Sequence, residues 1–198
     1  IINGKVYKDG TIKEEDLVFE NGRITEAGVK TDGEEIYDAC GNYVVPGFID
    51  VHTHGGAGVD VNAADAEGLK KIGRFFAGQG TTSWLCSILT DSKEQTLKTI
   101  KEAVKHQKAQ KNGHENCADL LGIHLEGPFL APEYKGAMPE QLLISPDVEL
   151  LKEYQKAAEG NIRYITVSPE VPGVPEAIRD IISLGMKVAI GHSGADYD

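Results

Sequence analysis

The stretch Pro46-Gly-Phe-Ile-Asp-Val-His-Thr-His54 opens the part of the chain that decides its fold. It is an apolar run that begins at a turn and ends in polar residues, as a buried parallel strand does. Runs of the same kind recur at residues 82–89, 121–126, 162–167 and 187–192. Amphipathic stretches separate them, which predicts parallel strands joined by helices in either a doubly wound sheet or a (β/α)₈ barrel.

The helical stretches carry their own periodicity and end signals. Apolar residues share one helical face in two of them, Leu69, Ile72 and Phe76 in the first and Leu97, Ile100 and Val104 in the second. Ser92 followed by Gln95 is a capping-box pattern, and Ser145 before Pro146 predicts a cap in front of a first-turn proline. Gly160 and Gly185 are placed as C-terminal stops.

The number of strand runs limits how much of a barrel the chain supplies. A complete (β/α)₈ barrel takes ~250 residues, whereas residues 46–198 contain about five strand-helix units. We therefore predict an incomplete (β/α)₈ TIM-type barrel over residues 46–198. We expect it to be the first part of a longer enzyme.

Residues 1–45 follow a different pattern. Two β-prone runs in residues 16–26 are joined by Asn21-Gly22, a dipeptide that tolerates the positive φ angles of a type I′ turn. This predicts a hairpin. We assign residues 1–45 to part of a small β-sandwich domain.

Composition excludes several classes of protein. The 198 residues include 20 Lys and Arg against 31 Asp and Glu, a net charge of −11, so nucleic acid is not expected as a partner. No apolar run approaches the ~20 residues of a membrane span. The three cysteines, Cys40, Cys86 and Cys117, form no paired motif, which argues against a disulfide framework or a thiolate zinc site and favours a reducing cytoplasm.

Side chains that can bind a metal stand at the ends of three strand runs. His52 and His54 are two residues apart, so they share one face of a strand at its C-terminal end, where barrel active sites are built. An isolated H-x-H pair is as often only the polar start of a loop, but Glu126 ends the third run and His192 the fifth. Imidazole and carboxylate groups suit Zn²⁺, Fe²⁺ or a similar divalent ion.

The remaining histidines and acidic residues are given structural roles. His124 shares the face of Glu126 but lies one layer deeper, so we interpret it as a hydrogen-bonded core histidine. His106 and His114 fall in a lysine-rich stretch and are expected on a solvated helix face and its exit loop. Asp196 and Asp198 are interpreted as the start of the next helix.

Three segments together resemble a known family. Residues 46–56 (Pro-Gly-Phe-Ile-Asp-Val-His-Thr-His-Gly-Gly), residues 122–129 (Gly-Ile-His-Leu-Glu-Gly-Pro-Phe) and Gly191-His-Ser193 are similar to the N-acetylglucosamine-6-phosphate deacetylases of the amidohydrolase superfamily. The hairpin around Asn21-Gly22 resembles the small β domain that opens many amidohydrolases. Leu125-Glu-Gly-Pro-Phe129 followed by Lys135-Gly-Ala137 is the most specific part.

The resemblance implies a set of roles. Glu126 and His192 would hold one divalent ion and His52 and His54 a second, with zinc or iron as the metal and one or two ions bound. Gly136, Ala137 and Met138 would lie in the substrate-contacting loop. The general acid/base aspartate would come after Asp198, the substrate would be an amino-sugar phosphate, and the full-length enzyme would be a cytoplasmic homodimer.

Two features leave alternatives open. The family commonly presents His or Gln at the position of Met138, and the thioether cannot make an equivalent hydrogen bond. Lys135 is the only nearby cation for a phosphate group. The alternatives are a related amidohydrolase acting on a cyclic amide or a nucleobase, and a non-catalytic fragment that needs a partner chain.

Overall fold

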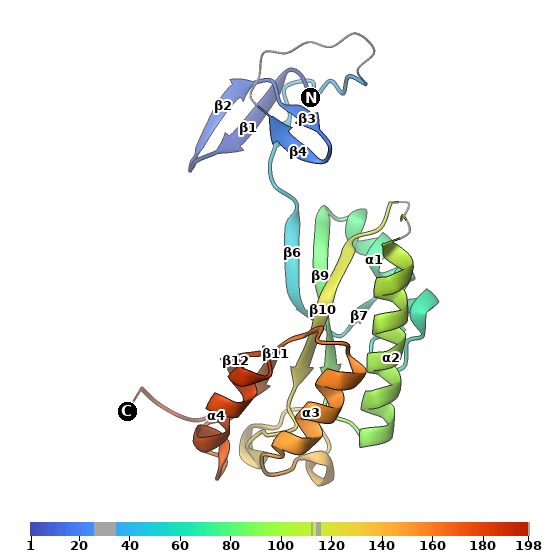
Figure 1. The fold of residues 1–198 in the computed structure, drawn as a ribbon. Helices are drawn as coiled ribbons and strands as arrows, with labels where there is room; N and C mark the ends of the chain where they lie inside the picture. The colour runs from blue at the N-terminus through green and yellow to red at the C-terminus, as the bar shows by residue number, and fades with distance from the viewer. Residues whose placement is uncertain (26–34, 112, 114–115, 198) are drawn as a thin grey trace. The chain divides into compact units, whose positions relative to one another are not determined.

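The computed structural model describes residues 1–25, 35–111, 113 and 116–197. Contacts divide the chain into two compact units, Ile1–Gly47 and Phe48–Asp198, and each unit is described by itself (Figure 1). The boundary expected from the sequence lies between residues 45 and 46.

The first unit contains two small sheets. β1 (Gly4–Lys8) pairs with β2 (Thr11–Glu15) antiparallel and with β5 (Tyr43–Val44) parallel. β3 (Val18–Glu20) and β4 (Arg23–Thr25) form the predicted hairpin. Asn21 and Gly22 have φ values of 52° and 73°, the positive angles that a type I′ turn requires. The hairpin is confirmed, while the sandwich stays a prediction.

The second unit is built on one parallel sheet. Its strands are β6 (Phe48–Thr53), β9 (Thr81–Leu89), β10 (Asp119–Glu126), β11 (Ile162–Val167) and β12 (Lys187–Ile190). They lie side by side in chain order. A doubly wound sheet reverses its strand order at a switch point. The sequential order found here therefore excludes the doubly wound sheet and favours the barrel. The five strands form a parallel half-barrel.

The helices lie in the connections between these strands. They are α1 (Ala66–Ala77), α2 (Lys93–Gln110), α3 (Val148–Ala157) and α4 (Val174–Ser183). A two-stranded ribbon of β7 (Gly55–Gly56) and β8 (Val59–Asp60) follows β6, and two 3₁₀ turns, η1 (Pro132–Tyr134) and η2 (Glu140–Leu142), follow β10. Figure 1 shows α1 and α2 packed together beside β9 and β10.

The hydrophobic core lies between the sheet and the helices. Trp84 of β9 and Ile123 of β10 are fully buried against Leu69 and Ile72 of α1 and Ile100 of α2. The predicted helical faces therefore point into the core, because apolar side chains at i, i+3 and i+7 come out on one side of a helix. This packing holds the strands in register and so fixes where their C-terminal ends lie.

His106 corrects one expectation. The lysine-rich stretch predicts a solvated helix face, but only 4% of His106 is exposed. One side of α2 is exposed and carries Lys101, Lys105 and Lys108. The other side is buried and carries Ala103, His106 and Gln107. The number of charged residues in the stretch does not show which side of the helix is buried. His114 lies outside the described residues.

The helix ends confirm three of the four predicted signals. The Ser92 side chain accepts from the backbone N–H of Gln95 and caps α2. Gly160 and Gly185 follow α3 and α4 with φ values of 80° and 85°, as C-terminal stops do. The Ser145-Pro146 prediction is wrong, because the Asp147 carboxylate accepts from Leu150 N at 2.9 Å and α3 begins at Val148.

Replacing Ile123 by Ala tests this core. The fully buried side chain packs at the centre of the sheet, so we expect Ile123→Ala to lower the free energy of unfolding by about 2–5 kcal/mol. Urea denaturation followed by circular dichroism measures the change. Ile182→Ala on the exposed side of α4 is the control, with an expected change within about 0.5 kcal/mol. Equal losses in the two variants would contradict the location of the core.

Candidate metal centre

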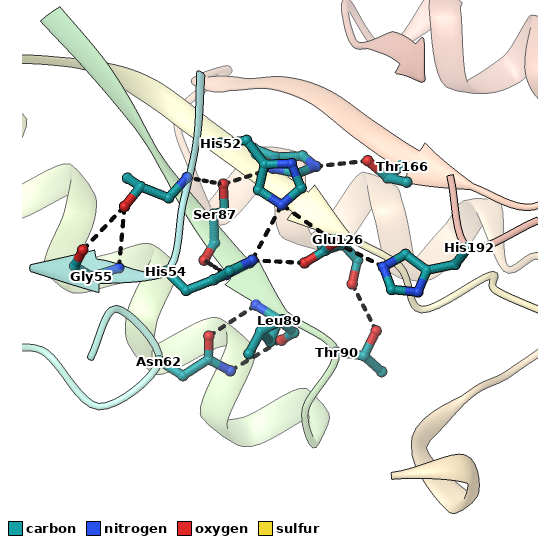
Figure 2. Close-up of polar contacts among 12 residues, drawn as sticks. His52, His54, Gly55, Asn62, Ser87, Leu89, Thr90, Glu126, Thr166 and His192 are labelled. Carbon is teal, nitrogen blue, oxygen red and sulfur yellow. Dashed lines mark hydrogen bonds and ion pairs between the residues drawn. The ribbon is translucent and has the colours of Figure 1, made fainter. Parts of the chain in front are cut away.

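The four predicted ligands come together at one rim of the half-barrel. His52 lies on β6 and His54 directly follows it, Glu126 is the last residue of β10, and His192 lies two residues beyond β12. All five strands are parallel, so their C-terminal ends meet at the same edge of the sheet. Figure 2 shows the three imidazoles around the Glu126 carboxylate.

The Glu126 carboxylate is the point of contact. Its Oε2 lies 2.9 Å from His54 Nε2, and its Oε1 lies 2.9 Å from His192 Nε2 and 3.3 Å from His52 Nε2. Only 6% of Glu126 is exposed. Ligand atoms of His52, His54 and Glu126 all lie within 4.8 Å of one another. A single ion is therefore within reach of both imidazoles and the carboxylate, and His192 reaches the same carboxylate from the other side.

Two of the imidazoles are oriented by backbone carbonyls. His54 Nδ1 lies 3.1 Å from the carbonyl oxygen of Ser87, and His192 Nδ1 lies 2.8 Å from that of Tyr134. A carbonyl only accepts, so both Nδ1 atoms carry hydrogen and donate. In the neutral tautomer each Nε2 then directs a lone pair at Glu126, which is itself an acceptor. Only a proton or a cation satisfies this arrangement, and the same carbonyl contacts orient metal-binding histidines in general.

The titration behaviour follows from this geometry. Burial would raise the pKa of Glu126, but the hydrogen bonds from His54 and His192 outweigh it and lower the pKa to about 2. The hydrogen bond to Glu126 raises the pKa of His54 against the opposing effect of burial. The carboxylate is thus held ionised, and a proton on His54 is favoured beside it. The donor set fits a divalent cation that takes the place of such a proton.

His192 lies in a loop rather than at a strand end, which corrects the sequence expectation. β12 stops at Ile190, and His192 has a φ of 51°, a left-handed conformation that cannot continue a strand. The Ser168 hydroxyl donates to His192 O at 2.6 Å and accepts from Ala131 N at 2.9 Å. Glu170 accepts from Ser193 Oγ and from Gly194 N, each at 2.8 Å. Sequence analysis missed Ser168 and Glu170 because neither belongs to a motif.

The predicted substrate loop borders His192. Gly136 has a φ of 60°, a left-handed angle that favours glycine, and it lies beside His192, since a Cβ there would be 3.6 Å from His192 Cε1. Ala137 is exposed, whereas only 4% of Met138 is exposed. Lys135 Nζ donates to Met138 O at 3.3 Å. Substrate contact by these residues stays a prediction.

Other residues weighed from the sequence take structural positions. His124 is fully buried with both ring nitrogens hydrogen-bonded, which confirms its interpretation as a core histidine. Burial raises the pKa of Cys86 to about 12 and also raises the pKa of Cys117, so neither is an activated thiol. Asp196 lies exposed in the irregular segment after β12, and Asp198 lies outside the described residues. No helix among the described residues is long and apolar enough to cross a membrane.

Sequence comparison finds relatives along nearly the whole chain. N-acetylglucosamine-6-phosphate deacetylase of Bacillus subtilis (strain 168) is 34% identical over 96% of the chain, and the enzymes of Lysinibacillus sphaericus and Homo sapiens are 31% and 33% identical over 98%. The chain spans 49–51% of the length of these curated relatives. No family model matches the chain.

Structure comparison points to the same enzymes. N-acetylglucosamine-6-phosphate deacetylase from Pasteurella multocida matches 98% of this chain and 50% of its own, with a TM-score of 0.84 and 26% identity. The Mycobacterium smegmatis enzyme, solved as a mutant in complex with N-acetyl-D-glucosamine-6-phosphate, matches 88% of this chain and 44% of its own, with a TM-score of 0.74 and 28% identity.

The parallel half-barrel with histidines and a buried carboxylate at its strand ends places the chain among the amidohydrolase-type hydrolases. Within that class the relatives and the structural neighbours agree. The chain belongs to the N-acetylglucosamine-6-phosphate deacetylase family and corresponds to about half the length of its members.

Competition between protons and a cation gives a pH test of the centre. A cation needs the His54 Nε2 lone pair, and the pKa of His54 is raised above 6.5. Zn²⁺ affinity, measured by calorimetric titration, should therefore fall as the pH is lowered from about 8 to about 6. His54→Ala should weaken binding at the higher pH and flatten this dependence. Glu153→Ala, an exposed carboxylate on α3, is the control. Unchanged affinity in His54→Ala would contradict the assignment.

Proposed function

We propose that the protein to which this chain belongs hydrolyses the acetamide group of N-acetylglucosamine 6-phosphate, giving glucosamine 6-phosphate and acetate. One observation carries the proposal: three imidazoles and an ionised carboxylate, from the end of β6, from β10 and from the segment after β12, converge within contact distance at the rim of a half-barrel. The relatives that match 96–98% of the chain are named for this activity, which supports the choice of substrate.

The ligand set determines what the centre can hold. The centre would bind one or two divalent ions through His52, His54, Glu126 and His192. The mixture of nitrogen and oxygen donors favours zinc or iron. Glu126 offers Oε1 toward His52 and His192 and Oε2 toward His54, so its two oxygens are placed to serve one ion or to bridge two. A bound divalent cation polarises a carbonyl oxygen and lowers the pKa of water.

The residues of the chain contribute charge and orientation. Glu126 supplies a fixed negative charge in a buried position, where its interaction with a cation is screened little by water. The carbonyl groups of Ser87 and Tyr134 keep the Nε2 atoms of His54 and His192 turned inward, so binding requires no ring rotation. Gly136 lies beside His192, and we assign the substrate loop to Gly136, Ala137 and Met138.

The groups that complete the reaction are assigned by resemblance. We expect the general acid/base to be an aspartate outside residues 1–198, because the one acidic residue inside the described centre, Glu126, already contacts all three imidazoles. Lys135, at the edge of the loop, is our candidate for the phosphate group of the substrate. We further expect a cytoplasmic homodimer.

Acetate release tests the proposal directly. The whole protein encoded by the gene, loaded with Zn²⁺, should release acetate from N-acetylglucosamine 6-phosphate and stop when a chelator is added. Glu126→Gln should lower kcat/KM by more than about 100-fold. Mutating a residue that only supports a metal ligand already costs 10–100-fold in affinity or activity, and loss of a ligand should cost more. Glu153→Gln should leave it unchanged. Faster hydrolysis of a cyclic ureide, or no acetate from folded, zinc-loaded protein, would contradict the proposal.

A further inference from the structure

β6 is irregular just where it presents the two histidines. Asp50 pairs with Trp84 and Thr53 with Cys86, with a shift of register between them, so β6 carries one more residue than β9 across this interval. This is a β-bulge, a device that re-aims side chains near active sites. Asp50 Oδ1 accepts from His52 N at 3.0 Å inside the bulge. The ladder hydrogen bonds that would fix the backbone of the H-x-H segment are interrupted here.

Ser87 of β9 supplies replacement contacts. Its Oγ accepts from the backbone N–H of Thr53 at 3.0 Å, and its carbonyl oxygen accepts from His54 Nδ1 at 3.1 Å. One fully buried residue therefore holds both the backbone between the two histidines and the imidazole of the second one. Figure 2 shows the contact between Ser87 and His54.

His124 holds Ser87 in turn. Its Nδ1 lies 2.8 Å from Ser87 Oγ and its Nε2 lies 2.8 Å from Thr166 Oγ1. Ser87 Oγ already accepts from Thr53 and is fully enclosed, so its hydroxyl donates to His124 Nδ1, and Nε2–H donates to Thr166.

The His124 ring also contacts the bulge and one of the residues that support it. It stacks on Tyr164 with 3.9 Å between ring centroids and meets the His52 ring edge-on at 4.7 Å. The Tyr164 hydroxyl donates to Val51 O at 2.7 Å. The bulge is thus held at Val51 by β11 and at Thr53 by β9, with His124 of β10 packed between these two supports.

This support matters because the bulge interrupts the pairing of β6 with β9 between Asp50 and Thr53. A bulge disrupts the backbone ladder locally, so the contacts from β9, β10 and β11 decide where the imidazoles lie.

We propose that Ser87 and His124 are positioning residues that fix the H-x-H segment before a cation binds, so that the cation meets two imidazoles already in place. Neither residue would touch the cation or the substrate. The inference rests on the proposed centre, but it concerns cation affinity, which is measured independently of substrate turnover.

The experiment compares two buried hydroxyl deletions. Ser87→Ala removes the contact to Thr53. Thr99→Val removes a hydroxyl of α2 that donates to Asn62 O at 2.8 Å and whose hydrogen bonds reach Asn62 and Gln95 but none of the four ligands. Zn²⁺ affinity is measured by calorimetry on metal-free protein, together with the melting temperature. Both variants should melt lower, but Ser87→Ala alone should bind Zn²⁺ 10–100-fold more weakly. Native affinity in Ser87→Ala would reduce Ser87 to a structural role and overturn the proposal.

A second pair of variants, at His124, tests the proposal if Ser87→Ala does not fold. His124→Gln keeps a donor and an acceptor in the buried site, and His124→Leu keeps neither. We expect His124→Gln to retain most of the Zn²⁺ affinity and His124→Leu to lose it. Equal Zn²⁺ affinities in the two variants would overturn the proposal. Deacetylase activity with normal affinity in these variants would reject this inference and leave the proposed function intact. Native protein that binds zinc but has no deacetylase activity would reject the proposed function and leave this inference intact.

Discussion

The buried Glu126 carboxylate is the constraint on which the rest of the site depends. An ionised group that is 6% exposed is costly to bury unless positive charge or donors surround it. Here the balancing groups come from strands far apart in the chain, His52 and His54 before it and His192 after it. The parallel arrangement brings these ends to one rim, so the fold supplies the groups that balance the charge of Glu126.

Much of this was predictable because the signals are local. Each strand run, the Asn21-Gly22 turn and the Ser92 cap depends on a few adjacent residues, and the polar residue that ends each run falls at the rim once the strands are parallel. The burial of His106 was not predictable from charge density, since one face of α2 is solvated and the other is not. The cap of α3 was missed because the Asp147 carboxylate outcompetes the preceding Ser145.

The supporting groups escaped prediction for a different reason. Ser87, Ser168 and Glu170 act through hydrogen bonds to segments far from them in sequence, and their residue types are common on any surface or strand. Their importance follows from position alone: each fixes a backbone that departs from regular geometry, the bulge before His54 or the left-handed His192. Irregular backbone at a site needs such partners, and they become visible only when the strands are assembled.

Anomalous diffraction from crystals grown with Zn²⁺ tests the central claim most directly. The account predicts a zinc peak at the rim, about 2.0–2.2 Å from a Glu126 oxygen and from the Nε2 atom of at least one of the three histidines. A peak bound elsewhere, or a rim that stays without zinc while the imidazoles turn away from Glu126, would contradict it.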